Sequence, residues 1–476
     1  MESSPPAPEP MLSSNPDTNW RSWCRDHFVL LVGVMFFTGF AFVFMSHPDR
    51  GPWQECFVRA ALRMQAGEAV HVVERHAYAY PPIMAMLAIP LANLPVTASM
   101  FGWYAVNVAA AVVVFVCAWR LAGGPTLVGL SATWGAIFWI GALLSVRFFL
   151  SPLECQQFDM IIAGLLFLGC YWIWRGHDFR GAALLGASAA MKCTPMLFAP
   201  YLVWRGKFRA ACLLAAVAVG LNLLPDVLCP QSSGRIYLVD WTRSFLNVVA
   251  TESPGTWFAD LLQNQSLAGL FNRFWRFGLP LAVPDLQVGP LSPFGKLALQ
   301  MLVYGTGLTL LAVTAWRFGK PFKAAPTVCR RAETPTSLDR LQTGIEASAV
   351  VCLMLLLSPM SSKSHYVVLL LPSLLIARLV VQQRNRWLRG LLVPLVIFGP
   401  LTAKGLLGKS LGDLTLAWGL PTWFALLTLV SMWIVLGARE REEEQAGDKK
   451  MVTPAPLTSR RPLETMPARR RMACRQ

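Results

Sequence analysis

The chain has 476 residues, of which 55% are hydrophobic and only 14% are charged. The apolar residues form long blocks separated by short polar segments, a composition that excludes an ordinary soluble globular protein. Lys and Arg outnumber Asp and Glu by 42 to 26. Because the basic residues gather at the ends of the apolar blocks, their excess indicates membrane topology and does not predict a nucleic-acid partner.

The apolar blocks predict an all-α polytopic membrane protein with about ten to twelve transmembrane helices, since each span needs roughly twenty apolar residues. Before them, residues 1–27 are rich in proline and polar side chains and are expected to be a disordered cytoplasmic segment. After them, residues 438–476 combine charges with prolines and are expected to be a disordered cytoplasmic tail. The transmembrane domain then covers residues 28–437, with blocks at Phe28–Met45, Val96–Trp119, Thr126–Leu150, Met160–Trp174, Ala182–Trp204, Ala210–Leu224, Leu297–Trp316, Ala347–Pro359, Tyr366–Val381, Trp387–Pro400 and Trp418–Val435.

The cysteines do not form a disulfide pattern. There are 11 of them, an odd number, and most lie inside apolar blocks. They are interpreted as small buried hydrophobic side chains, with Cys117, Cys170, Cys212 and Cys352 as examples.

The block ending at Trp204 breaks the alternation of sides across the membrane. If both termini are cytoplasmic, basic flanks put the start and the end of Gly181–Trp204 on the cytoplasmic side. A lysine and a proline interrupt this block at Lys192 and Pro195, so two short helices forming a hairpin with an outward tip are predicted. A single span with one miscounted neighbour is the alternative.

Two long segments are expected on the extracytoplasmic face of the plasma membrane, Ser46–Tyr80 and Asp226–Lys296. Their aromatic residues predict short helices lying along the membrane interface. Polar and ionisable residues also gather on this face, and ionisable groups near membrane depth indicate a functional site. These residues are His47, Asp49, Glu55, His71, His76, Glu154, Gln156, Gln157, Asp159, Lys192, Asn264, Gln265, Lys363 and His365.

No spacing in the chain predicts a metal site or a bound cofactor. The histidines are scattered, and neither a zinc motif nor a glycine-rich phosphate loop is present. An enzyme of this kind would need an activated donor delivered within the membrane.

Several motifs, taken in order, resemble glycosyltransferase family 87. An acidic segment from Glu55 to Gly67 leads to Tyr80-Pro81-Pro82. Gln157-Phe158-Asp159 resembles the family's Gln-x-Asn, and Lys192-Cys193-Thr194-Pro195 its Lys-x-x-Pro. Asn264-Gln265-Ser266 and Ser358-Pro359-Met360-Ser361 follow, with His365-Tyr366 after them. The resemblance spans roughly Phe28 to Trp433.

The resemblance implies a GT-C-type bundle that moves a sugar, typically mannose, from a polyprenyl-phosphate donor to a glycolipid or cell-envelope acceptor outside the cytoplasm. It also implies an inverting displacement with a carboxylate of the first outer loop as base. The family's aspartate aligns with Glu55, so glutamate replaces it, and Asp49 is the alternative base. Glu55 could instead cap a helix or pair with Arg50 or Arg59.

The departing lipid phosphate needs cationic or donor partners. Lys192, Lys363 and His365 are the candidates, although the tryptophan and first histidine of the family's last motif are replaced here by Ser362 and Ser364. Gln157 and Asp159 are candidates for the sugar hydroxyls, and Tyr80, Asn264 and Gln265 are counted with the donor-binding residues as members of the matching motifs.

Each of these residues also has a simpler interpretation. Lys192 could be a lysine that extends to the membrane surface, His365 a histidine at a helix start, and Gln157 with Asp159 a pair that caps a helix. A lipid or sugar transporter and a catalytically impaired homologue are the alternative functions.

Overall fold

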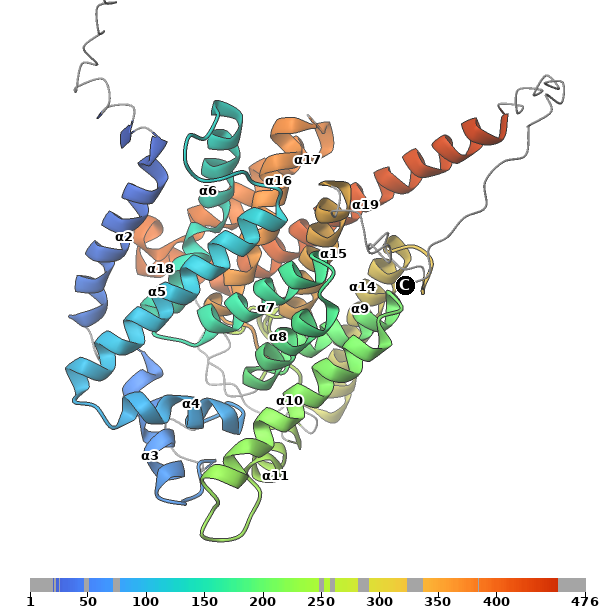
Figure 1. The fold of residues 1–476 in the computed structure, drawn as a ribbon. Helices are drawn as coiled ribbons and strands as arrows, with labels where there is room; N and C mark the ends of the chain where they lie inside the picture. The colour runs from blue at the N-terminus through green and yellow to red at the C-terminus, as the bar shows by residue number, and fades with distance from the viewer. Residues whose placement is uncertain are drawn as a thin grey trace, which may run out of the picture.

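The computed structural model describes residues 20, 23–24, 26–46, 51–71, 78–247, 252–256, 262–280, 291–322, 337–383 and 385–452, with side chains described to residue 438. Within these ranges all regular structure is helical, which confirms the predicted all-α class (Figure 1). The longer helices are α2 (Phe28–Met45), α5 (Val96–Leu121), α6 (Ala132–Glu154), α7 (Asp159–Trp174), α8 (Asp178–Met191), α10 (Phe208–Leu228), α14 (Pro293–Arg317), α15 (Ser337–Leu357), α16 (Leu370–Gln382), α17 (Arg386–Phe398), α18 (Lys404–Ala417) and α19 (Leu420–Val452).

Eight helices of the described chain are long and apolar enough to cross a membrane, or nine if the bent pair α17 and α18 counts as one span. The chain is therefore a multi-pass membrane protein, with fewer full-length spans than predicted. The difference arises at α7 and α8, which are too short to qualify by length, and at α17 and α18, whose axes differ by 97°.

Helix starts are explained by local capping. α6 begins at Ala132, because the Ser131 hydroxyl accepts a hydrogen bond from the Trp134 amide, so the helix starts later than the block at Thr126 suggested. Ser292 caps α14 in the same way, with Pro293 at its first position. Pro95 precedes α5, whose run of apolar residues extends to Leu121.

The interrupted block forms the predicted hairpin. α8 ends at Met191, and a short 3-10 helix η3 (Thr194–Leu197) and α9 (Phe198–Trp204) follow the break at Lys192. Asp178 at the start of α8 is ion-paired with Lys207 just after α9, at 2.5 Å. This ion pair brings the two ends of the hairpin together and leaves its tip at Lys192. Near the tip, the Ala190 carbonyl accepts a hydrogen bond from Asn222, late in α10.

The two long segments carry short helices, as predicted. The first contains the π-helix η2 (Trp53–Val58), α3 (Arg59–Gln65) and, just after it, α4 (Pro82–Ala92). The second contains α11 (Tyr237–Trp241), the π-helix η4 (Thr242–Leu246) and α13 (Leu267–Phe277). In Figure 1, α3, α4 and α11 lie at the lower end of the molecule, while the start of α2 and the end of α19 lie toward the upper end.

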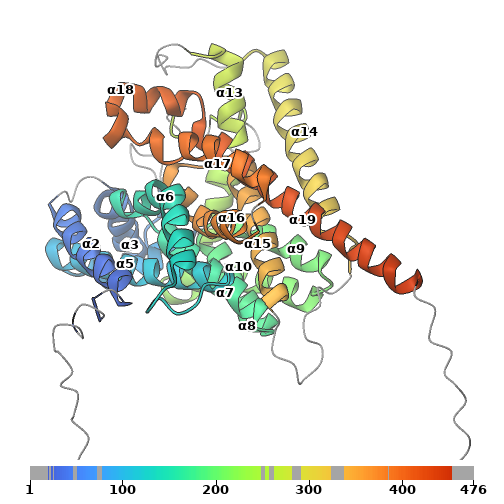
Figure 2. The same ribbon diagram turned by 90° about the horizontal axis from the view of Figure 1, so that it is seen from above.

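A large apolar core joins α5, α6, α7, α15, α16 and α19, and a second one lies under η2, α3 and α4. Figure 2 shows α14 at the edge of the bundle, beside α13 and α19. The core cysteines Cys117, Cys170 and Cys352 are buried and free, whereas Cys212 is exposed on α10, contrary to prediction. Its position on the outward face of the helix is the reason.

The two tails differ from the prediction near the domain. α19 continues to Val452, so residues 438–452 of the expected disordered tail are helical. The sequence there is rich in Glu, Arg, Lys and Ala, which favour helix. At the other end, Trp20, Trp23 and Cys24 have helical backbone, and Trp23 stacks on His27. Residues 1–19, 21–22, 25 and 453–476 lie outside the described residues.

Candidate functional site

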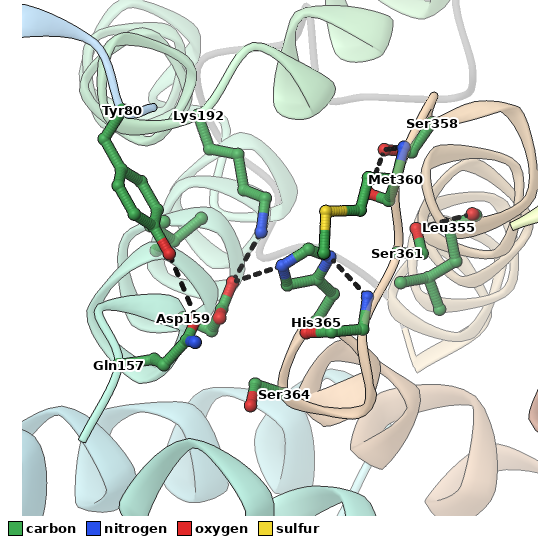
Figure 3. Close-up of polar contacts among 12 residues, drawn as sticks. Tyr80, Gln157, Asp159, Lys192, Leu355, Ser358, Met360, Ser361, Ser364 and His365 are labelled. Carbon is green, nitrogen blue, oxygen red and sulfur yellow. Dashed lines mark hydrogen bonds and ion pairs between the residues drawn. The ribbon is translucent and has the colours of Figure 1, made fainter. Parts of the chain in front are cut away.

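Three of the predicted site residues meet at one point of the fold. Asp159 lies in the first turn of α7, Lys192 lies at the hairpin tip, and His365 lies in the 3-10 helix η5 (Lys363–Leu369). The Lys192 Nζ donates to Asp159 Oδ1 at 2.8 Å, and His365 Nε2 lies 3.8 Å from the same oxygen (Figure 3). Their side chains are 6%, 17% and 12% exposed for Asp159, Lys192 and His365, so charges and imidazole are held together largely out of water.

The orientation of His365 is set by its own helix start. The Ser362 amide donates to His365 Nδ1 at 3.1 Å, while the Ser362 hydroxyl caps the same turn. A neutral imidazole that accepts at Nδ1 carries its proton at Nε2. The ring therefore presents a donor toward Asp159.

A small cavity of about 20 Å³ lies against these three side chains. Its size suits about one water molecule. The remaining lining residues come from α7, η3, α15, the loop after α15 and η5: Ile162, Thr194, Met354, Leu355, Ser358, Ser361 and Val368. A phosphate group can therefore enter only if a side chain such as Lys192 moves outward.

Two further candidate residues, Tyr80 and Gln157, border this cluster. The Tyr80 hydroxyl donates to Gln157 Oε1 at 3.3 Å, and both side chains lie beside Asp159 in Figure 3. Burial and the nearby Asp159 carboxylate hold the pKa of Tyr80 well above its usual range, so the phenol stays protonated.

His71 supports the backbone of this segment. Its Nε2 donates to the Tyr80 carbonyl at 3.0 Å. Burial lowers the pKa of His71 to about 4, against the opposing effects of that hydrogen bond and of Asp240. The ring is therefore neutral at pH 7 and acts as a fixed donor to the backbone at Tyr80.

The candidate base Glu55 lies on η2, which packs beside Tyr80. Phe57 contacts the Tyr80 ring with centroids 4.7 Å apart, and Trp53 stacks on Trp103 at 4.2 Å. Trp53 and Phe57 are buried, whereas Glu55 is on the exposed side of the same helix. Glu55 therefore lies on a helix that contacts Tyr80, but its side chain does not line the small cavity.

Asp49, the alternative base, lies outside the described residues. Gly51, close after it, is in tight contact with the turn before α7. A Cβ at Gly51 would lie 2.6 Å from the Cys155 carbonyl oxygen and 2.7 Å from Gln156 Cβ. The start of η2 therefore lies directly against the corner that carries Gln157 and Asp159.

Asn264 and Gln265 are fully buried and bind the loop that borders the site. Asn264 donates to the Pro359 carbonyl at 2.9 Å and accepts from the Ser361 amide at 3.3 Å. The backbone amide of Gln265 donates to the Ser361 carbonyl at 2.6 Å, and the Tyr366 hydroxyl donates to the backbone carbonyl of Gln265 at 2.5 Å. The structure therefore shows these residues holding the Ser358–Ser361 loop rather than lining the small cavity.

Lys363 is separate from the cluster. It shares η5 with His365, but its charged neighbours are Arg147, Lys404 and Glu154. Ser358 and Ser361 also line the cavity, a role that the motif match alone does not assign to them. The signal in the sequence is the two serines of Ser-Pro-Met-Ser directly after an apolar block. Among the described residues no group of His, Cys, Asp and Glu could hold a metal ion.

Comparison with known proteins relates this chain to membrane glycosyltransferases. The model of glycosyltransferase family 87 matches residues 78–330, slightly more than half of the chain. The matched stretch includes Tyr80, Gln157, Asp159, Lys192, Asn264 and Gln265, whereas the candidate bases precede it and His365 follows it. No solved structure matches the chain.

Two curated relatives are mycobacterial. The chain is 26% identical over 384 residues to a polyprenol-phosphate-mannose-dependent alpha-(1-2)-phosphatidylinositol mannoside mannosyltransferase of Mycolicibacterium smegmatis, an alignment that covers 76% of this chain and 77% of the relative. It is 25% identical over 298 residues to a polyprenol-phosphate-mannose-dependent alpha-(1-2)-phosphatidylinositol pentamannoside mannosyltransferase of Mycobacterium tuberculosis, covering 61% of this chain and 56% of the relative.

Proposed function

Since this chain belongs to glycosyltransferase family 87 and is a membrane glycosyltransferase, we propose that it transfers mannose from a polyprenyl-phosphate donor to a glycolipid acceptor. The observation that carries the proposal is the Asp159, Lys192 and His365 cluster at the hairpin tip, within a family whose two mycobacterial relatives use polyprenol-phosphate-mannose. Both relatives act on phosphatidylinositol mannosides, which supports a glycolipid as the acceptor. A transporter, the alternative function, is not favoured by these relationships.

In the proposed reaction, the acceptor hydroxyl attacks the anomeric carbon of the donor sugar. A new glycosidic C–O bond forms, the C–O bond to the phosphate breaks, and the polyprenyl phosphate leaves with the electron pair. The hydroxyl proton passes to a carboxylate base within hydrogen-bond reach. The chain's own contribution is to place that base and to stabilise the charge on the leaving phosphate.

Lys192 and His365 are the proposed phosphate partners. Both present donors into the same small space, and both face a single carboxylate oxygen of Asp159 in the structure. When the phosphate enters, Lys192 exchanges part of its interaction with Asp159 for the phosphate oxygens, and Asp159 and Gln157 are then free to accept from sugar hydroxyls. Lys363, Tyr80, Asn264 and Gln265 act around this centre, the last two by positioning the Ser358–Ser361 loop.

The base is proposed to come from the first outer segment, as Glu55 or Asp49. Glu55 is exposed on η2, where an acceptor can reach it, and Gly51, two residues after Asp49 in the sequence, lies against Cys155. The two carboxylates therefore need a direct comparison by mutation.

The site is proposed to face the extracytoplasmic side, with both termini cytoplasmic. Basic residues at the block ends support this orientation. The start of α2 and the end of α19 also lie toward one end of the bundle, opposite α3, α4 and α11 (Figure 1).

The test is mannose transfer in membranes containing the protein, with radiolabelled polyprenyl-phosphate mannose and a lipid extract. We compare wild type with Glu55→Gln and Asp49→Asn, and use Glu68→Gln, an exposed carboxylate of the same outer segment, as the control. Loss of the true base lowers the rate by about a hundred- to ten-thousandfold, whereas the control keeps wild-type activity. Absence of transfer from the wild type, or equal activity in all variants, would refute the assignment.

A further inference from the structure

A second and much larger cavity lies next to the candidate site. Its volume is about 550 Å³, within the range of about 300–1,000 Å³ that is usual for sites of small organic ligands. It lies between α13, α14, the end of α15 and the loop at 252–255. Its walls are mainly aliphatic, with Leu267, Ala268, Leu308, Leu311, Leu356 and Leu357 among the lining residues.

The cavity faces the outside of the helix bundle through α14. Tyr304 and Leu308 line it and are also among the exposed large hydrophobic residues of the chain. α14 lies at the edge of the bundle in Figure 2, so an apolar chain can reach the cavity from the surrounding lipid.

The large cavity adjoins the small one at a single residue. Ser358 lines both cavities, and in Figure 3 it lies on the side of His365 away from Asp159. The loop that separates the two spaces is held by Asn264 and by the Ser358 hydroxyl, which donates to the Met360 carbonyl at 2.5 Å. A ligand with a polar head at Lys192 and His365 would therefore direct whatever is attached to that head into an apolar space.

We propose that this cavity binds the first isoprene units of the donor's polyprenyl chain, an inference that rests on the proposed function. In such a donor the hydrocarbon is bonded directly to the phosphate, so a phosphate at Lys192 and His365 places the chain at the adjoining cavity. In a glycolipid acceptor, at least one sugar separates the acyl chains from the reacting hydroxyl. Because Ser358 lines both cavities, the large cavity lies where a chain bonded directly to that phosphate would extend, which favours the donor chain over the acceptor's acyl chains.

Two glycines of α14 provide a matched pair of variants. A Cβ at Gly307 would point at the cavity, where the nearest atom is Leu357 Cδ2 at 3.0 Å, the flexible end of a side chain. A Cβ at Gly305 would meet no atom within 4 Å and lies on the exposed face. Gly307→Phe fills the cavity, whereas Gly305→Phe adds the same side chain to the same helix outside it.

The experiment measures KM for undecaprenyl-phosphate mannose and for methyl-phosphate mannose, a donor that has no isoprene unit to fill the cavity. The wild type is expected to have a KM at least about tenfold lower for the long donor, equivalent to about 1.4 kcal/mol; burying two methylene groups supplies that much. Gly307→Phe is expected to abolish the difference between donors, and Gly305→Phe to retain it. A difference that survives in Gly307→Phe, or that is lost equally in Gly305→Phe, overturns the inference.

Two further measurements separate the possible occupants and the two proposals. A rise in KM for the acceptor in Gly307→Phe, with the donor difference intact, would assign the cavity to acyl chains and contradict the inference. Binding of sugar-free undecaprenyl phosphate is measured by native mass spectrometry on the same purified proteins. One outcome would support the inference and refute the proposed function. In that outcome the wild type binds undecaprenyl phosphate, Gly307→Phe binds it at least about tenfold more weakly, and neither protein transfers mannose.

Discussion

The ion pair between Asp159 and Lys192 allows stability and transfer to be tested together. The Lys192 Nζ lies 2.8 Å from Asp159 Oδ1, and the side chains are 17% and 6% exposed. At an effective dielectric constant of about 20, the attraction at this distance is about 6 kcal/mol before the cost of removing both charges from water. Asp159→Asn leaves the Lys192 charge without its carboxylate in a largely buried place, and such a loss destabilises a protein by about 3–5 kcal/mol.

Lys192→Met should destabilise the protein less than Asp159→Asn does. The reason is that Asp159 keeps His365 Nε2 at 3.8 Å as a second partner. The double variant removes both charges, so its loss of stability should be smaller than the sum of the single losses, by about 0.5–3 kcal/mol. All three variants should transfer mannose at least about a hundredfold more slowly than wild type, because Lys192→Met removes a partner of the leaving phosphate and Asp159→Asn removes the carboxylate that holds Lys192 in place.

The assay combines thermal unfolding of the purified protein in detergent with transfer from polyprenyl-phosphate mannose. Recovery of stability without recovery of activity in the double variant would separate the functional role of the pair from its structural one. Strictly additive losses, or an Asp159→Asn protein that matches wild type in both measurements, would refute the reasoning.

Three other predictions concern regions away from this pair. The Arg205 Nε donates to Glu346 Oε2 at 3.0 Å between buried side chains. Glu346→Ala should therefore cost about 3–5 kcal/mol of stability, and the double variant Arg205→Met with Glu346→Leu should recover most of that loss. Absence of recovery in thermal unfolding would contradict this prediction. His71 has a folded pKa of about 4 against about 6.5 when unfolded, so the unfolded state binds more protons between these values and stability falls as pH falls through that window, by about 2 kcal/mol at pH 5. The melting temperature of wild type should therefore drop more between pH 7 and pH 5 than that of His71→Gln, and parallel drops would count against it. Cys193, exposed at the hairpin tip, should react with a membrane-impermeant maleimide added outside intact cells when the other cysteines are replaced, and labelling only after lysis would reverse the proposed orientation.

Much of the architecture follows from local sequence. The block from Phe28 to Met45 is a helix with the predicted bounds, and the break of the Gly181–Trp204 block falls at Lys192. Apolar length and a break by lysine and proline are local properties, because a span must satisfy its own backbone in lipid. The short helices in the long segments were also predictable from their aromatic residues.

Only the tertiary structure decided which polar residues meet. Asp159, Lys192 and His365 are far apart in the chain, and their distances depend on how η5 packs against α6 and α7 and on where the hairpin tip ends. Glu55 and Asn264 also show that the sequence alone does not determine which polar side chains are buried. Both are polar residues of the family motifs, yet packing leaves Glu55 exposed and buries Asn264 completely.

The sequence by itself determined a membrane bundle with polar residues gathered at one end and a glycosyltransferase motif order. The tertiary structure decided which of those polar side chains share a cavity, that the Asn264-Gln265 motif supports a loop, and that an apolar space adjoins the site at Ser358. The physical reason is that the hydrophobic pattern acts along single helices, whereas a cavity is made by side chains from several helices at once. Its shape therefore depends on packing between segments that no local pattern specifies.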